Sequence, residues 1–317
     1  MAHDSQSHYR ADSDAHAHSQ AQTQEGNSTP PYQRYYVPTQ SHWPIMGSLG
    51  LFVTVLGVVN IIHDHPYGYY IFIGGVCILI FMMFGWFSNV IHESQQGLYS
   101  PQLDRSFRWG MAWFIFSEVM FFGAFFGALF YARELAVPWL GGIGDKASTH
   151  MLWENFQATW PLLKNPDPNK YPDTLHAMHA WGIPALNTLI LLSSGATVTW
   201  AHIALKNGKR TQLVIGLLAT ILLGATFLGF QAYEYHDAYT ELNLKLSTGI
   251  YGTSFFMLTG FHGAHVTIGT IMLLVVWLRC LKGHFTPDHH FAFEAVAWYW
   301  HFVDVVWLML FIFVYWL

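Results

Sequence analysis

Seven long apolar stretches follow one another along the chain, separated by shorter polar segments. A hydrocarbon core about 30 Å thick needs about 20 apolar residues of helix to cross it. The stretches that reach this length run over about Pro44–Ile62, Tyr69–Ile91, Trp109–Tyr131, Leu175–Ala204, Gln212–Tyr233, Thr248–Leu281 and Phe291–Trp316. The pattern therefore predicts an all-α, polytopic membrane protein with seven transmembrane helices.

The composition supports this class of protein. Of the 317 residues, 53% are hydrophobic and 10% are charged, whereas soluble domains carry about 25% charged residues. The net charge of −5 forms no basic stripe, so nucleic acid is not expected as a partner. Residues 1–42 are polar and rich in Ser, Gln and His. Such a segment buries too little apolar surface to offset its ordering entropy, and we predict a disordered cytoplasmic tail there.

Lysine and arginine in the loops predict the orientation in the membrane. With the N-terminus inside, nine of them lie on the inner side: Arg10, Arg34, Arg105, Arg108, Lys206, Lys209, Arg210, Arg279 and Lys282. The outer side holds Lys245 in a short loop and four more in a long connection at about residues 132–174. This bias predicts a cytoplasmic N-terminus and a C-terminus on the outer side. Residues 43–91 hold the first two helices, and residues 109–317 hold a five-helix bundle.

A single carboxylic acid interrupts the third stretch, WFIFSEVMFFGAFF. This residue, Glu118, has only apolar neighbours one helical turn away: Phe114, Ile115, Phe121 and Phe122. Desolvation without a cation disfavours the charged form, so we predict that Glu118 is protonated near neutral pH. Gly123 and Gly127 lie roughly opposite and predict a close helix contact on that side. Intramembrane acids are costly, so proton-linked or lipid-cleft function and a structural hydrogen bond are both open for Glu118.

The sixth and seventh stretches also carry polar side chains. His262 and His265, three residues apart, suit either a metal or haem site or hydrogen bonds across a helix seam; without an acidic or cysteine ligand on the helix, the seam is favoured. In the seventh stretch, Glu294, His301 and Asp304 line roughly one face. Such a face must meet protein, because lipid would leave it unsatisfied. We expect an interhelical polar network there, with a proton relay as the alternative.

Several longer runs resemble subunit III of the haem–copper cytochrome c oxidases. They are SEVMFFGAFFGALFY, TWAHIAL, ILLGATFLGFQAYEY, GIYGTSFFMLTGFHGAHVTIGT and HFTPDHHFAFEAVAWYWHFVDVVWLMLFIFVYW. The likeness extends over nearly the whole chain from about Trp43. It implies two helices and five helices around a V-shaped, lipid-filled cleft. It also implies that this chain binds no haem, copper or other metal and docks on the catalytic subunit I and on subunit II, which hold the redox groups.

The resemblance also assigns expected roles to particular residues. Glu118 falls on the family's carbodiimide-reactive acid, which is linked to proton uptake and to sustained turnover. Glu93 matches an acid at a lipid site, although the neighbouring basic residue is His92 here. Arg279, Lys282 and His284 in RCLKGHF are expected to hold a phospholipid phosphate at the cytoplasmic interface; ordinary positive-inside charges are the alternative.

The function implied by the resemblance is that of an accessory, non-catalytic subunit of a proton-pumping oxidase that passes electrons from cytochrome c to dioxygen. A quinol oxidase subunit is the nearest alternative. A proton-coupled transporter using Glu118, His262 and Asp304 is less favoured, because no repeated halves are evident. A haem-binding cytochrome would need axial histidines at a pocket. The long outer connection is consistent with a bacterial plasma membrane protein.

Overall fold

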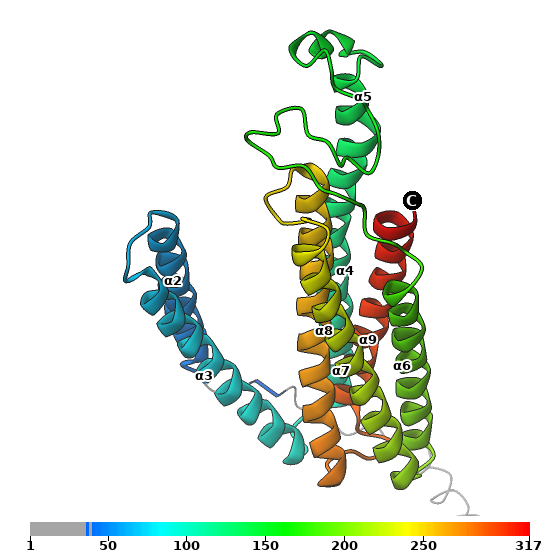
Figure 1. Ribbon diagram of the computed structural model, residues 1–317. Helices are drawn as coiled ribbons and strands as arrows, with labels where there is room; N and C mark the ends of the chain where they lie inside the picture. The colour runs from blue at the N-terminus through cyan, green and yellow to red at the C-terminus, as the bar shows by residue number, and fades with distance from the viewer. Residues whose placement is uncertain (1–35, 38–39) are drawn as a thin grey trace, which may run out of the picture. The chain divides into compact units, whose positions relative to one another are not determined.

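The computed structural model describes residues 36–37 and 40–317, so most of the tail predicted at 1–42 lies outside the described residues. Every described element is helical (Figure 1). Seven helices are long and apolar enough to cross a membrane, which confirms the predicted fold class. They are α2 (Trp43–Ile62), α3 (Gly68–Gln95), α4 (Pro101–Phe130), α6 (Ile183–Lys206), α7 (Arg210–Thr240), α8 (Ile250–Leu281) and α9 (Phe291–Leu310). The chain divides into two compact units at Arg105; the cleft expected between two and five helices stays a prediction.

Two helix ends differ from the sequence-based bounds. The third span does not stop near Tyr131: α4 continues through a π-helical turn, η1 (Tyr131–Ala136), into the short α5 (Val137–Leu140). The fourth span begins later than predicted, because residues before Ile183 are not helical. Gly182 has a φ of 146°, which only glycine adopts readily, and Pro184 occupies the first turn, where its missing N–H costs nothing.

The first unit is a helical hairpin made by α2 and α3. Its two helices approach closely at glycines. A methyl group added at Gly57 would collide with the backbone of Phe72, and one added at Gly75 would collide with Thr54. Small residues at a contact allow this close packing in membrane helices, where dispersion contacts replace the hydrophobic effect as the driving force.

The core of the second unit lies along α9. The indole rings of Trp300 and Trp307 are fully buried. The Nε1 of Trp300 donates a hydrogen bond to Ser194 Oγ (2.9 Å), and the Nε1 of Trp307 donates one to Thr188 Oγ1 (3.0 Å). Both hydroxyl groups belong to α6, so large aromatic side chains fill the seam between α6 and α9 while their polar atoms are satisfied. The last turns, η3 (Phe311–Trp316), are π-helical.

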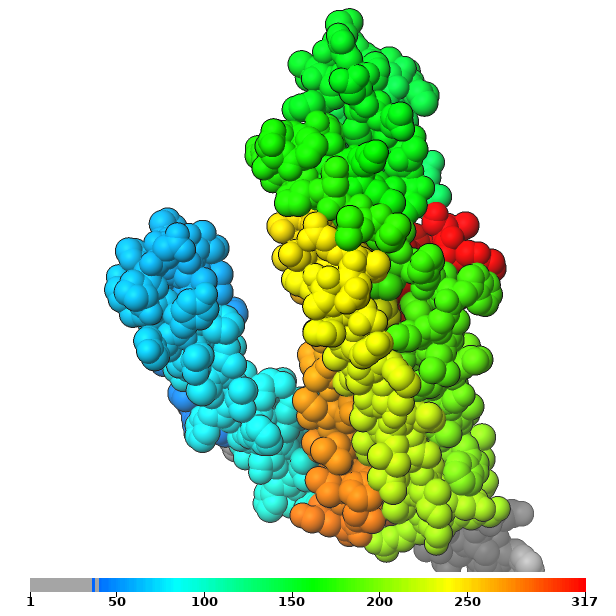
Figure 2. All heavy atoms as spheres, viewed as in Figure 1, coloured from blue at the N-terminus to red at the C-terminus, as the bar shows by residue number. Residues whose placement is uncertain are grey.

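The long connection between α5 and α6 covers the turn between α7 and α8. Leu175 N donates to Leu242 O (3.0 Å), and Asn165 Nδ2 donates to Thr248 O (3.1 Å). Figure 2 shows this green segment seated on the yellow end of the bundle. The connection contains one short 3₁₀ helix, η2 (Ala147–Leu152). Long loops are uncommon unless they cover something, and this one does.

Candidate functional site: an acid–imidazole pair and polar seams of the bundle

Glu118 on α4 has a partner on α8. Its Oε2 lies 2.9 Å from Nε2 of His265, and the two side chains are only 21% and 14% exposed. The neighbours on its own helix are apolar, as the sequence indicates, but a neighbouring helix supplies an imidazole. The structure therefore brings Glu118 into direct contact with His265, one of the two histidines singled out on α8.

The hydrogen bonds of His265 limit how the pair is protonated. The Nδ1 of His265 lies 2.6 Å from the carbonyl oxygen of Phe261. A carbonyl only accepts, so Nδ1 carries a hydrogen. The remaining nitrogen, Nε2, then accepts from a protonated Glu118, or donates to an ionised Glu118 as part of an imidazolium. Both arrangements place one proton between the two groups and leave the pair neutral overall. The protonated form predicted for Glu118 is one of these two arrangements and stays a prediction.

Aromatic rings surround the Glu118–His265 pair. The imidazole of His265 stacks on Tyr299 at 6.4 Å between centroids and meets Phe122 edge-on at 5.1 Å. Phe121 also approaches the same imidazole. Such rings exclude water and lower the local dielectric, which strengthens the acid–imidazole hydrogen bond. The Glu118–His265 pair is therefore a polar contact surrounded by aromatic side chains.

The close contact predicted at Gly123 and Gly127 is wrong for the described part of the chain. No described atom lies within 4 Å of a Cβ built at either position. Glu118, not the glycine side of α4, meets another helix of the bundle.

His262 occupies a separate environment from His265, although both lie on α8. Its imidazole is 1% exposed, and Nε2 lies 3.2 Å from the carbonyl oxygen of Val303 on α9. It packs against Phe227 and Trp307. Gly269, further along α8, makes close contact with aromatic rings of α9, whereas no described atom lies within 4 Å of a Cβ built at Gly263. The two histidines thus bond different partners and do not converge on one ion.

The polar residues of α9 also separate into two groups. Glu294 Oε2 forms an ion pair of 2.6 Å with Nη1 of Arg108 at the start of α4. Further along, Asp304 Oδ2 lies 3.9 Å from His301 Nδ1, and His301 Nε2 lies 3.2 Å from Thr199 Oγ1 on α6. The expectation that the whole stripe is enclosed by protein is wrong within this chain, because the His301 side chain is 47% exposed.

Asp304 and His301 line a groove between α6 and α9 of about 550 Å³. Asp304 itself is only 6% exposed and lies against Gly195, where any larger residue would collide with its carboxyl group. Its Oδ1 has no hydrogen-bond partner within the described part of the chain. Apart from Asp304, His301 and Thr199, the residues that line the groove are apolar.

A further buried acid, Glu234 on α7, was not recognised in the sequence. It is 2% exposed, and the hydroxyl group of Tyr315 lies beside it. Glu234 lies in the run QAYEYHD near the end of α7, which also holds Asp237. Glu118 is therefore not the only acid enclosed by the bundle, and both Glu234 and Asp304 are more buried.

Basic side chains gather where α8 ends, around the predicted phosphate site. Arg210, from the first turn of α7, donates from Nη2 to the carbonyl oxygen of Leu281 at 2.7 Å. Partial burial, together with the positive charges of Arg279 and Lys282, lowers the pKa of His284. The contribution of Arg279 and Lys282 to that lowering reflects a positive local potential, which suits a phosphate group. The sequence analysis used Arg210 only to predict the orientation, and the structure places it at the end of α8 beside the predicted phosphate site.

The other predicted lipid contact, Glu93, lies near the end of α3. Its Oε2 accepts a hydrogen bond of 2.9 Å from the Tyr99 hydroxyl group. Tyr36 also lies close to this carboxyl group, and its ring is 6.2 Å from that of Tyr99. The carboxyl group is thus held by tyrosine hydroxyl groups within the first unit.

Comparison with known proteins identifies the family. The profile of the family described as "Cytochrome c oxidase subunit III" matches residues 33–152 and 149–317. The chain is similar to the cytochrome c oxidase subunit 3 of Marchantia polymorpha, with 43% identity over 283 residues covering 89% of this chain and 96% of that protein. The subunits of Arabidopsis thaliana and Drosophila melanogaster are each 42% identical over the same shares. The chain therefore belongs to the cytochrome c oxidase subunit III family.

Proposed function

We propose that this chain is an accessory subunit of a proton-pumping oxidase that passes electrons from cytochrome c to dioxygen. The family match over nearly the whole chain carries this proposal. The catalytic subunit I and subunit II hold the haem and copper groups and perform the redox chemistry. The histidines of α8 support this division, because His262 and His265 are each engaged by a protein group.

The Glu118–His265 pair is the site through which we propose that the chain influences proton uptake. An acid and an imidazole that share one proton can take up a second proton or give up the shared one. The surrounding rings of Phe122 and Tyr299 keep the pair away from bulk water. The pair acts as a local proton store that supports continued turnover, while subunit I supplies the obligatory proton path.

Phospholipid binding is the second proposed role. The cluster made by Arg210, Arg279, Lys282 and His284 offers several donors at the end of α8, where a headgroup phosphate would meet the membrane surface. A phosphate there would also shield like charges from one another. Glu93, with its tyrosine partners, is the proposed contact for a second lipid.

The membrane orientation is a third part of the proposal. The ends of α6 and α8 and the beginnings of α7 and α9 lie at the same end of the bundle (Figure 1). That end carries Lys206, Lys209, Arg210, Arg279 and Lys282. We assign it to the cytoplasmic side. The length of the connection between α5 and α6 favours a bacterial plasma membrane. The plant and animal relatives favour an organelle membrane instead.

The electron donor gives the clearest test of this function. The complex that contains this chain is purified from its native membranes, and oxygen uptake is measured with reduced cytochrome c and, separately, with a quinol. We expect uptake with cytochrome c, and co-purification of haem-containing subunits. Oxygen uptake with quinol but not with cytochrome c would show instead that the chain is a subunit of a quinol oxidase. Recovery of the chain as a lone monomer or homodimer without haem would refute it.

A further inference from the structure

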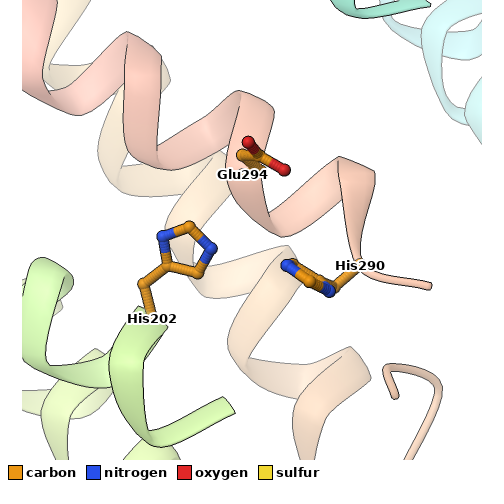
Figure 3. Close-up of side chains that lie close together, drawn as sticks. All are labelled: His202, His290 and Glu294. Atoms are coloured by element: carbon orange, nitrogen blue, oxygen red, sulfur yellow. The ribbon is translucent and has the colours of Figure 1, made fainter. Parts of the chain in front are cut away.

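Three side chains with metal-binding groups meet where α6 ends and α9 begins. His202 comes from the last turns of α6, His290 precedes the first residue of α9, and Glu294 lies in the first turn of α9. One ligand atom of each residue lies within 4.8 Å of the ligand atoms of the other two. Figure 3 shows the two imidazoles and the carboxyl group around one common space. None of these groups takes part in the Glu118–His265 pair.

The hydrogen bonds of the two histidines leave nitrogen lone pairs for an ion. The Nδ1 of His290 lies 3.2 Å from the carbonyl oxygen of Thr286. It must carry the hydrogen of that bond, so Nε2 of the neutral ring keeps its lone pair. The Nε2 of His202 is buried and has no hydrogen-bond partner among the described residues. A buried nitrogen without a partner destabilises the fold, and a bound cation would remove that cost.

The donor set selects one class of cation. Two imidazole nitrogens and one carboxylate oxygen suit zinc and similar transition metals, whereas Mg²⁺ and Ca²⁺ prefer oxygen ligands. With bonds of about 2.0–2.1 Å, ligand atoms around a tetrahedral zinc lie about 3.4 Å apart. The present separations of up to 4.8 Å therefore need only a small closing rotation of the side chains. Water would occupy the fourth position.

Two positive charges nearby oppose a cation. Arg108 is ion-paired to Oε2 of Glu294 at 2.6 Å, and Lys206 lies one turn beyond His202 on α6. A carboxylate has two oxygens, so Glu294 can bind a metal ion and Arg108 at the same time. The charges lower the affinity, and they make it sensitive to the removal of Arg108.

We propose that His202, His290 and Glu294 form a zinc-type metal site that fastens the end of α6 to the start of α9. The site does not depend on the electron donor or on the role of Glu118. His202 is far from His290 and Glu294 in the sequence, and no short sequence motif predicts that the three residues meet. Their convergence is a consequence of the packing of α6 against α9.

Zinc binding to the intact purified oxidase complex tests the site. The complex is treated with a chelator, dialysed against increasing Zn²⁺, and analysed for zinc bound per complex. We expect the wild type to bind one zinc ion more than the His202→Gln and His290→Gln variants, at concentrations where the wild-type site is filled. His289→Gln is the matched control, because His289 is exposed and lies outside the three residues. Equal zinc content in all four complexes would overturn the proposal.

Two further measurements keep the test decisive if a histidine variant fails to assemble. X-ray absorption at the zinc edge should show two imidazole nitrogens in the wild type, and Glu294→Gln should bind less zinc per complex, because it loses the carboxylate ligand. Arg108→Gln should tighten zinc binding several-fold, because it removes a positive charge beside Glu294. Unchanged or weaker binding in Arg108→Gln, or a zinc spectrum without imidazole, would exclude these residues as the ligands.

Discussion

The hairpin α2–α3 and the helices α6 to α9 of the bundle are both strongly apolar, yet they bury very different shares of their spans; α4, at 11%, resembles the hairpin in this respect. Only 11% and 6% of the apolar windows of α2 and α3 are buried within the chain, compared with 33% to 50% for α6, α7, α8 and α9. The hairpin packs through glycines, whereas the bundle packs through large aromatic side chains with satisfied polar atoms. Exposed apolar surface on this scale must be covered by lipid or by another subunit.

The difference also explains where the polar residues lie. In the hairpin, Thr54 and Asn60 bond the backbone of their own helix. In the bundle, Thr188, Ser194 and His262 bond atoms of a neighbouring helix. Polar groups that link helices therefore occur where helices are enclosed by others, and these are the places where the candidate sites are found.

Removing a buried indole should have the largest effect. Trp300→Ala should destabilise the chain by about 3–5 kcal/mol, since it leaves a cavity and removes the hydrogen bond that the indole donates to Ser194 Oγ. Trp86 on α3 is 47% exposed, and Trp86→Ala should change stability by about 0.5 kcal/mol or less. Denaturant unfolding in lipid–detergent micelles compares the two variants. Equal losses would contradict the difference in enclosure between the two units.

Overpacking the hairpin should have the next largest effect. Gly75→Ala places a methyl group against the backbone of Thr54, and we expect a loss of about 1–3 kcal/mol in the free energy of unfolding. Gly74 is the adjacent control, because no described atom lies within 4 Å of its Cβ position. Gly74→Ala should stabilise the helix slightly. If both variants lose the same stability, the glycine contact does not hold the hairpin together.

The acid–imidazole pair should contribute less than either of these packing effects. A double-mutant cycle of Glu118→Leu and His265→Phe should give a coupling of about 0.6 kcal/mol and no more than about 1.7 kcal/mol, as for other hydrogen bonds between membrane helices. Ser117 bonds the backbone of its own helix, so a cycle of Ser117→Ala with His265→Phe should give no coupling. Coupling in the control cycle and none between Glu118 and His265 would refute the contact.

The smallest effect should be the pH dependence of lipid binding. The lowered pKa of His284 leaves it neutral near neutral pH, and a bound phosphate would favour its protonated form. Binding of an anionic phospholipid should therefore tighten as the pH falls through this pKa. It should be constant at higher pH. Native mass spectrometry of the complex at several pH values measures this. The dependence should vanish in His284→Gln and persist in His289→Gln.

Much of the fold was predictable because it follows from the length of apolar runs. The seven spans were found from hydropathy alone, and the seventh ends at the predicted Trp316. The start of α6 was missed, since the apolar residues from Leu175 onward looked helical. Gly182 and Pro184 set the true start, and their signal was present in the sequence as a local glycine–proline pattern.

The contacts of the site were less predictable, because they depend on which helices lie side by side. Glu118 and each α8 histidine were noticed separately, but their pairing needed the packing of α4 against α8. The contacts of His202 with His290 and of Glu234 with Tyr315 also depend on helix packing, and their residues were not singled out in the sequence. Sequence spacing reports faces of one helix, whereas these sites are built from side chains of two.

The most direct test of the account is oxygen uptake by the assembled complex that carries Glu118→Gln, followed over many turnovers. Glutamine keeps the shape of the side chain and a hydrogen bond to His265 but cannot exchange a proton. We predict normal assembly, an initial rate close to that of the wild type, and a changed rate of inactivation during turnover. Complete loss of oxygen reduction from the first turnover in a fully assembled complex would contradict the supporting role proposed for this chain.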